Sequence, residues 1–309
     1  MVKRAGLKIL WLLPFAGSNP VPHILYKSSF ITRVFISRGI MNLQIKMELD
    51  KQMHRDELKL RILVTDKCNL DCSFCLNDFQ RKVHETFSFI EEKTVFSAIE
   101  AYSNFFEGKY PLQVYFSGGE PTLHKNLVSF LEFAKDNKCR TTLVSNGYFK
   151  RELEDKLTKV VDCMHISAYK KDERLRNKAV RMSADIQSVY SSLDPYVDME
   201  FLGFYISAGL KVKIFPDFFD KDYADYQNFL NKSEKVFPKG SLSGRYTGHQ
   251  ENRGLGCFGC DRKCITLKAA WVYSNGSTSP CVQHLFTKKP ESMEDWINSF
   301  KSAENFHKV

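Results

Sequence analysis

The feature that most constrains the fold is an alternation, from Leu58 onward, of short β-prone runs with longer amphipathic stretches. Such an alternation is typical of parallel β/α folds, because a helix is the usual connection between parallel strands. A complete barrel has eight such units in about 250 residues, so a shorter array predicts an α/β fold with a partial (β/α)6 TIM-like barrel, open on one side. Six strands are expected, over residues 60–64, 114–116, 141–144, 164–167, 199–206 and 212–215.

Helices are expected between these runs. Ser88 and Glu91 have the spacing of a capping box before an apolar helical face, and Ser292 and Asp295 have the same spacing before a short helix over 293–300. The other expected helices cover residues 126–137, 150–160, 172–190 and 221–237. Because ligands of such sheets bind beyond the carboxyl ends of the strands, the chemistry is expected in the loops after the first strands.

The ends of the chain differ in composition from this array. Residues 1–57 are expected to be an extension or to follow from a start codon assigned too far upstream, and their apolar run over 9–15 mimics a signal peptide but is too short to span a bilayer. Residues 58–237 form the expected core. Residues 238–256 are rich in Gly, Ser and polar side chains and predict a linker, and residues 257–309 form a small cysteine-rich β-hairpin domain with a last helix.

Composition and charge narrow the class of protein. The apolar and charged fractions, 43% and 26%, are those of a soluble globular chain. The net charge of +9 is spread along the sequence and favours anionic substrates slightly, with nucleic acid a weaker interpretation. Seven of the nine cysteines fall in two tight groups, which indicates metal ligation rather than disulfides, and an iron-sulfur site would imply a reducing cytoplasm.

The first cysteine group, Cys68, Cys72 and Cys75, directly follows the first expected strand. Three thiolates on one short loop can bind three irons of a cubane cluster, which leaves the fourth iron without a protein ligand. The alternative is a zinc site completed by a histidine. The spacing argues against zinc, because structural zinc sites usually pair two Cys-x-x-Cys units.

Two further motifs extend this pattern. Phe74 precedes the last cysteine of the group, and the sequence Ser117, Gly118, Gly119, Glu120, Pro121 follows the second expected strand. With these residues the chain, over about 58–216, resembles the radical S-adenosylmethionine (SAM) superfamily.

The resemblance implies a 4Fe-4S cluster on Cys68, Cys72 and Cys75 whose open iron is chelated by SAM. It also implies that the glycine turn and Glu120 approach the methionyl ammonium of SAM, where a side chain in place of glycine would block close approach. Contacts with the SAM carboxylate or ribose would follow the third and fourth strands. The implied cofactor-binding residues are Phe74, Ser117, Gly118, Gly119, Glu120, Ser145, Asn146 and Ser167. Ordinary turn chemistry is the alternative for Ser145, Asn146 and Ser167.

The second group comprises Cys257, Cys260, Cys264 and Cys281. A β-prone run over 265–273 and a turn over 274–277 predict a hairpin before Cys281, and this stretch resembles the twitch and SPASM auxiliary-cluster domains. The chain departs from those domains, which commonly take their remaining ligands from downstream of the hairpin. A second 4Fe-4S cluster is implied; a four-cysteine zinc ribbon is the alternative, with His284 a possible replacement ligand. Cys139 and Cys163 are expected to be small buried apolar residues.

The leading functional hypothesis is a radical SAM enzyme. Its 5'-deoxyadenosyl radical would remove hydrogen from an unidentified small-molecule or peptide substrate, for an oxidative modification, with a flavodoxin- or ferredoxin-type electron donor. A maturase acting on a ribosomal peptide is the runner-up. A zinc-binding module that contacts nucleic acid is the hypothesis of another class. A cytoplasmic location, without membrane association, is expected.

Overall fold

The computed structural model describes residues 58–75, 88–109, 111–193, 196–217, 220, 223–244, 269–280 and 289–306. The chain divides into two compact units, Met1–Gln52 and Met53–Val309, and the described residues belong to the second. The expected N-terminal extension and the four cysteines of the second group therefore lie outside the described residues.

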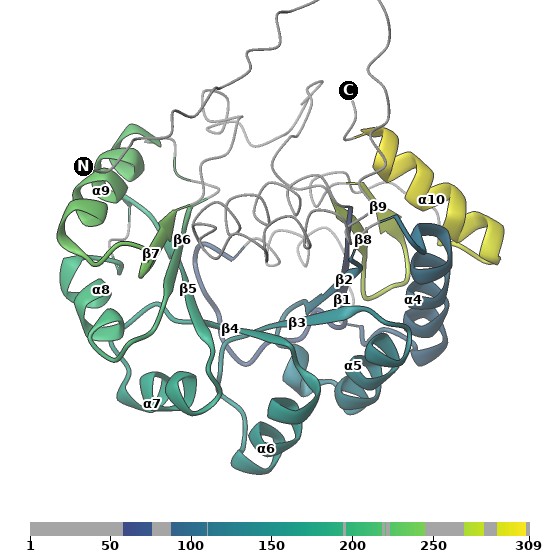
Figure 1. Ribbon diagram of the computed structural model, residues 1–309, viewed down its shortest axis with the longest axis horizontal. Coiled ribbons are helices and arrows are strands. Elements are labelled where there is room, and N and C mark those ends of the chain that lie inside the picture. Colours follow the sequence, from purple (N-terminus) through teal and green to yellow (C-terminus); the bar gives the residue numbers. More distant parts are fainter. Residues whose placement is uncertain are drawn as a thin grey trace, which may run out of the picture. The chain divides into compact units, whose positions relative to one another are not determined.

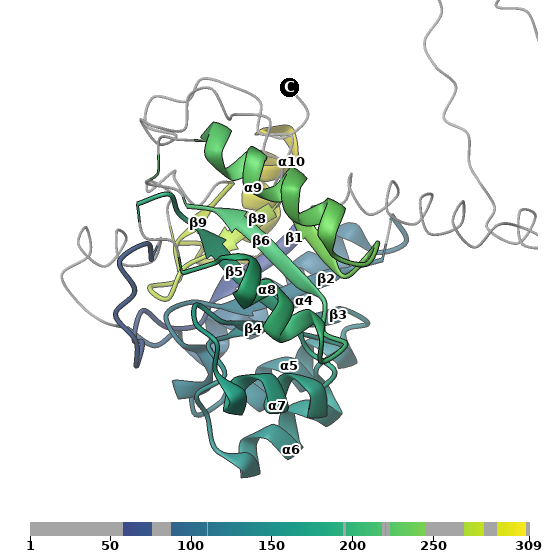
Figure 2. The same cartoon turned by 90° about the vertical axis from the view of Figure 1, so that its left-hand side faces the viewer.

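The described residues build a curved, mostly parallel sheet with helices along its outer side (Figure 1). Six parallel strands pair in chain order: β1 (Lys59–Leu63), β2 (Gln113–Ser117), β3 (Arg140–Ser145), β4 (Cys163–Ser167), β5 (Asp185–Tyr190) and β6 (Val212–Pro216). The helices that follow them are α4 (Glu92–Phe106), α5 (Leu127–Asp136), α6 (Arg151–Val160), α7 (Glu173–Arg181), α8 (Met199–Ile206) and α9 (Tyr223–Val236). Figure 2 shows α7, α8 and α9 covering the outer face of β4 to β6.

This architecture confirms the predicted partial barrel. Within the described residues the strand order is β7-β6-β5-β4-β3-β2-β1-β8-β9, so that β7 (Leu242–Gly244) and β9 (Thr278–Ser279) are the edges and the sheet does not close. The strand β7 pairs in parallel with β6. Its three residues lie inside the stretch expected to be a linker, so the sheet continues into that stretch.

Two element assignments from the sequence are wrong. Residues 199–206 were expected as a strand and form the helix α8, whose N-cap Asp198 accepts a hydrogen bond from the backbone N–H of Phe201 at 2.7 Å. Residues 172–190 were expected as one helix, but α7 ends at Arg181 and β5 begins at Asp185. The chain turns at Ser183, whose φ of 51° is left-handed although it is not a glycine.

The predicted hairpin is present and joins the core sheet. The strand β8 (Ala269–Val272) pairs antiparallel with β9 and parallel with β1, and Gly276 takes the left-handed position of the turn with φ of 82°. The last helix, α10 (Met293–Phe306), packs on α4, where the ring centroid of Phe300 lies 5.8 Å from that of Tyr102. The described part of residues 257–309 is therefore continuous with the core.

One of the two predicted capping boxes forms. Before α10, the backbone N–H of Asp295 donates to Ser292 Oγ and the N–H of Ser292 donates to Asp295 Oδ2, both at 3.1 Å. The box expected at Ser88 and Glu91 is wrong, because Glu91 is the N-cap of α4 and makes no side-chain cap. Ser88 instead contacts the loop after β1.

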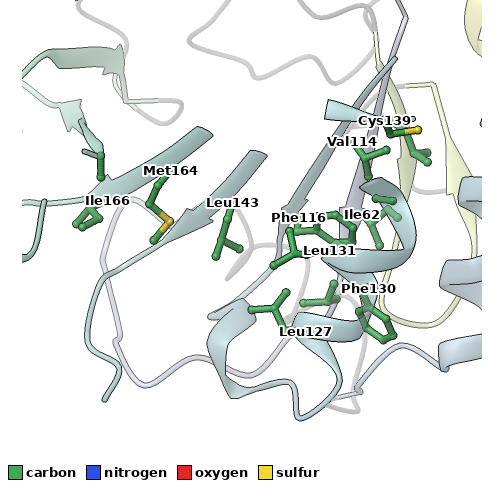
Figure 3. Packing of buried hydrophobic residues seen from close by; sticks show 14 of the residues in the cluster. Ile62, Val114, Phe116, Leu127, Phe130, Leu131, Cys139, Leu143, Met164 and Ile166 are labelled. Carbon is green, nitrogen blue, oxygen red and sulfur yellow. The ribbon is translucent and has the colours of Figure 1, made fainter. Parts of the chain in front are cut away.

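The two faces of the sheet differ in chemistry. Alternate side chains of a strand point to opposite faces, and one set packs against the helices in the main core, as Figure 3 shows for Ile62, Val114, Phe116, Leu143, Met164 and Ile166. The other set lies on the concave face and includes charged and aromatic side chains such as Arg61, Tyr115 and Trp271. Among the described helices, none is long and apolar enough to cross a bilayer.

Candidate active site

The first cysteine group lies in the loop after β1, at the carboxyl-terminal edge of the sheet. Cys68, Cys72 and Cys75 are partly exposed, and none of them forms a disulfide. The N–H of Cys75 donates to the carbonyl of Cys72 at 3.0 Å, which closes a turn between them. The N–H of Leu70 donates to Cys68 Sγ at 3.4 Å. The thiolate is the form of cysteine that binds iron.

The glycine turn after β2 braces this loop. The N–H of Gly119 donates to the carbonyl of Thr65 at 2.6 Å, and the N–H of Glu120 donates to that of Lys67 at 2.7 Å. A Cβ on Gly118 would lie 2.4 Å from Thr65 O, and a Cβ on Gly119 would lie 2.2 Å from Lys67 O. Both glycines are therefore required by contact between two backbones, in addition to the ligand approach that the sequence suggested.

Glu120 is fully buried and joins the ends of two strands. Its Oε1 accepts hydrogen bonds from the Thr122 N–H at 3.0 Å and from Ser145 Oγ at 2.7 Å. Its Oε2 accepts the N–H of Asn146 at 2.7 Å. The Glu120 carboxylate thus holds together the turn after β2 and the end of β3, and Ser117 precedes the same turn at the end of β2.

Asn146 extends this connection to the cysteine loop. Its Nδ2 donates to Asn69 Oδ1 at 2.6 Å and lies 3.9 Å from Cys68 Sγ, while its Oδ1 accepts the N–H of Tyr148 at 3.0 Å. The structure therefore brings the first cysteine, Glu120, Ser145 and Asn146 into one network. Asn69 was missed by the sequence analysis, although its place beside Cys68 was a signal.

Phe74, in the cysteine loop, lies among aromatic side chains that include Tyr169, just after the end of β4. Its ring centroid is 4.5 Å from that of Tyr169 and 6.2 Å from that of Tyr196. Burial, together with the nearby Cys72 thiol, raises the pKa of Tyr169, which keeps its hydroxyl neutral. Ser167, at the end of β4, accepts a hydrogen bond from Gln187 Nε2 at 2.9 Å. Tyr169 was also missed, although it follows the end of a strand by two residues.

A further network joins the cysteine loop to the C-terminal hairpin. The carboxylate of Asp66 accepts hydrogen bonds from Ser88 Oγ at 3.1 Å and from Ser274 Oγ at 2.5 Å. Ser274 lies in the turn between β8 and β9. These contacts couple three segments that are far apart in the sequence, and no short motif marks them.

The donor set of the loop suits a cluster. Within the described ranges, no group of three or more His, Cys, Asp or Glu side chains has the geometry to hold one metal ion. A cubane cluster places each thiolate on a different iron, so its ligands need not converge on a single point. Three thiols on one braced loop therefore fit an iron-sulfur cluster.

The two isolated cysteines differ in their surroundings. Cys139 is buried as expected, and burial raises the pKa of its thiol to about 12. Cys163 is only partly buried, and its Sγ lies 3.6 Å from Nε2 of His165. Cys163 and His165 alternate along β4 with Met164 and Ile166, which face the helices, so both lie on the concave face. The expectation of a simple apolar role is therefore wrong for Cys163.

Fold and site together define a class of protein: a parallel β/α partial barrel with a three-cysteine loop after its first strand and a glycine-rich turn after its second. Residues 62–191 match the model of the Radical SAM superfamily. This segment is a radical SAM domain, and the family implies a 4Fe-4S cluster and SAM.

Curated relatives are similar over parts of their length. The chain is 25% identical over 168 residues to a "Probable GTP 3',8-cyclase" of Methanocaldococcus jannaschii, which covers 53% of this chain and 54% of the relative. It is 30% identical over 149 residues to a "GTP 3',8-cyclase" of Aquifex aeolicus, with 44% and 43% covered. For a third such protein, of Actinobacillus succinogenes, the chain is 34% identical over 91 residues, which cover 29% of this chain and 26% of the relative. The chain thus spans about a quarter to about half the length of these relatives.

Solved structures share the fold. Streptococcus suis SuiB bound to S-adenosylmethionine superposes with a TM-score of 0.59 at 14% identity, covering 91% of this chain and 78% of SuiB. Native anSMEcpe with bound AdoMet gives 0.54 at 16% identity, with 80% and 82% covered. At these identities the likeness concerns the fold.

Proposed function

We propose that this chain is an enzyme that cleaves SAM reductively at a 4Fe-4S cluster on Cys68, Cys72 and Cys75. The resulting 5'-deoxyadenosyl radical removes a hydrogen atom from a substrate bound on the concave face of the sheet. The observation that carries this proposal is the three-cysteine loop, which the Gly118–Gly119–Glu120 turn holds through two short backbone hydrogen bonds.

The residues of the site have distinct proposed roles. A bound cluster would supply the electron that breaks a carbon-sulfur bond of SAM. The N–H of Leu70 and the amide of Asn146 donate to the sulfur of Cys68 and would orient it toward the cluster. Gly118, Gly119, Glu120, Ser145 and Asn146 form the polar rim on which the methionyl part of SAM would bind. Phe74 and Ser167 would border its nucleoside part.

Two substrate classes have support. The curated relatives bear the name GTP 3',8-cyclase, and one solved neighbour is SuiB bound to precursor peptide SuiA, with a TM-score of 0.58. The net charge of +9 and the cations of the concave face favour an anionic small molecule. A ribosomal peptide is the second candidate, and it rests on the likeness to the SuiB fold.

We propose that Cys257, Cys260, Cys264 and Cys281 hold a second 4Fe-4S cluster, with zinc as the alternative. Four thiolates leave no open iron, so this cluster would accept an electron from the substrate radical and make the overall reaction oxidative. Replacing Cys281 with Ala should then leave SAM cleavage intact and impair formation of the oxidised product. A redox-neutral product would contradict this role. A flavodoxin- or ferredoxin-type donor in a reducing cytoplasm would reduce the first cluster.

The decisive experiment measures 5'-deoxyadenosine. The full chain is loaded anaerobically with iron and sulfide, supplied with SAM and dithionite, and analysed by liquid chromatography. Replacing Cys68, Cys72 and Cys75 together with Ala should abolish 5'-deoxyadenosine while roughly four irons per chain remain at the second group. Cys139→Ala is the control, because this cysteine is buried in the helix-side core. Undiminished cleavage in the triple variant would overturn the assignment.

A further inference from the structure

The concave face of the sheet carries charged side chains away from the cysteine loop. Arg61 on β1, His165 on β4 and Lys213 on β6 belong to the strand residues that alternate with the helix-facing core. Arg61 and Lys213 both lie close enough to His165 to act on its charge. In the sheet order β1 lies on one side of β4 and β6 on the other, so the three side chains come from strands spread across the concave face.

Arg61 is the most unusual member of this group. Its guanidinium lies over the rings of Tyr115 and Trp271, with its Cζ 4.4 Å and 5.2 Å from the two centroids. These residues are its register partners on the two neighbouring strands, so the side chain is fixed on both flanks. Its Nε is buried, and among the described residues no hydrogen-bond acceptor reaches that atom.

A buried guanidinium without a counter-charge is costly, because desolvation opposes the charged form. Burial accordingly lowers the pKa of Arg61. In the described part of the chain no carboxylate pairs with it, whereas Arg176, another arginine stacked on a ring, pairs with Glu173. Two aromatic faces orient the Arg61 fork but neutralise none of its charge, and an anion from outside the chain would do so.

The surroundings of Arg61 add to this positive field. His165 is buried, and its Nδ1 has no hydrogen-bond partner within the described residues. Burial, together with Lys213 and Arg61, lowers the pKa of this side chain to about 4. Among the described residues Asp185 lies beside His165, with Oδ2 at 4.0 Å from Nδ1, and its side chain is 40% exposed. This carboxylate does not pair with Arg61, so the guanidinium charge keeps no partner in the described part of the chain.

We propose that this group is a binding site for a phosphate group of the substrate, with Arg61 as the anchor and His165 and Lys213 as further donors. That the bound anion is part of a substrate rests on the proposed function, whereas the existence of an anion site at Arg61 does not. Phosphate fits better than a carboxylate, because the planar guanidinium of arginine binds two phosphate oxygens at once and a third oxygen remains for the other donors.

The position of the site suits a small phosphorylated substrate. Arg61 precedes the end of β1 by two residues, and the cysteine loop begins at Asp66, about 17 Å farther along an extended chain. A phosphate bound at Arg61 would leave the rest of the molecule extending along the concave face toward the loop. The carbon that loses hydrogen would then lie between the phosphate site and the cluster.

The test measures binding of inorganic phosphate and pyrophosphate to the full, cluster-loaded chain without SAM or reductant. Trp271 fluorescence and the melting temperature are followed, because this indole stacks on Arg61. We expect saturable binding, a rise in melting temperature, and pyrophosphate binding more tightly than acetate. Arg61→Gln should weaken binding at least tenfold, and Arg61→Lys should weaken it less while retaining the charge.

Arg176→Gln is the matched control, since it removes an arginine that is stacked on Phe204 and already paired, and it should leave binding unchanged. Circular dichroism verifies that each variant is folded, and Arg61→Lys is the variant to measure if Arg61→Gln does not fold. Absent phosphate binding, equal binding by Arg61→Gln, or tighter binding of acetate would overturn the proposal. The iron and sulfide content of the same variants reports on the first cluster separately from anion binding, so failure here is distinguishable from failure of the proposed SAM chemistry.

Discussion

Among single residues, Glu120 shows how the site is organised before any ligand binds. Its buried carboxylate accepts hydrogen bonds from Thr122, Ser145 and Asn146, and so fixes the ends of β2 and β3 relative to each other. The ammonium group of SAM would therefore meet a carboxylate that is already oriented. Such preorganisation is what a binding site gains from a buried, fully hydrogen-bonded charge.

Replacing Glu120 with Gln should destabilise the protein by about 2–4 kcal/mol, because the new amide group cannot accept the hydrogen bonds that the carboxylate oxygen accepted. Chemical denaturation followed by circular dichroism measures this loss. Glu91→Gln is the control, since that side chain is 74% exposed and its pairing with Lys289 is a surface contact, worth about 1 kcal/mol at most. Equal stability of the two variants would mean that the Glu120 network contributes little.

His165 predicts a pH dependence of stability. Its folded pKa of about 4 lies below the ordinary value of 6.5, because burial, Lys213 and Arg61 all disfavour the charged form, while the nearby Asp185 and Cys163 do not reverse this. The unfolded chain therefore binds the proton more tightly below pH 6.5. Stability from this group is complete above about pH 7 and falls as the pH drops toward 4, by up to about 3 kcal/mol.

Denaturation of the full chain between pH 7 and pH 4 measures this slope, and His165→Gln should flatten it by the same amount. The substitution removes the titrating group and keeps a polar side chain of similar size. A slope that is unchanged in the variant would show that His165 does not titrate in this range. Phosphate in the buffer must be avoided, because the proposed anion site includes this residue.

At the scale of elements, the glycine turn after β2 and the loop after β1 behave as one unit. Gly118→Ala and Gly119→Ala should each force the two backbones apart, because the added Cβ would lie 2.4 Å and 2.2 Å from carbonyl oxygens. We expect loss of most of the iron bound at the first group, measured as iron and sulfide per chain together with the visible absorbance.

Gly108→Ala is the matched control for these variants. Gly108 also has a left-handed φ, 72°, but nothing lies within 4 Å of the position of its Cβ. It should lose about 1 kcal/mol of stability from backbone strain alone and keep its iron. Iron contents that fall equally in all three variants would point to general destabilisation rather than to the contact with the cysteine loop.

The sequence could predict those elements whose local residue preference is the same as the structure that they adopt in the fold. β1 to β4 and β6 were found because each is a compact apolar run followed by a turn or a helical pattern. The helix α8 was not, since its residues Phe201, Phe204 and Tyr205 favour strands, and tertiary packing overrides this preference. The sequence analysis did not separate the strand β5 from α7, because neither Gly nor Pro marks the turn at Ser183.

The site could be predicted only where it follows a motif. The cysteines and the turn at Gly118 stand in short, specific patterns, and their loops are where those patterns placed them. The residues Asp66 and Ser274, which contact each other, lie 208 positions apart in the sequence. Arg61 could be identified as a candidate only after the structure placed it between Tyr115 and Trp271 of the neighbouring strands. Such contacts come from the pairing of strands, which one sequence does not specify residue by residue.

For the whole molecule, the C-terminal segment belongs to the same folding unit as the barrel. β8 extends the sheet beyond β1, and α10 buries Trp296, Phe300 and Ala303 against the core. The turn of the hairpin also contacts Asp66 at the start of the cysteine loop. The described part of the C-terminal segment is therefore attached to the edge of the barrel and contacts the cysteine loop through Ser274.

This arrangement predicts that a destabilising substitution in α10 lowers the stability of the whole sheet. The ring of Phe300 is fully buried and lies 5.8 Å from that of Tyr102 on α4, so Phe300→Ala should cost about 3–5 kcal/mol. Met293→Ala, at the 40% exposed first position of α10, should change stability by less than about 0.5 kcal/mol. In Phe300→Ala the unfolding transitions seen by far-ultraviolet circular dichroism and by tryptophan fluorescence should shift together to lower denaturant. If the segment after 257 were an independent domain, the two signals would separate, and the barrel would unfold at its original midpoint.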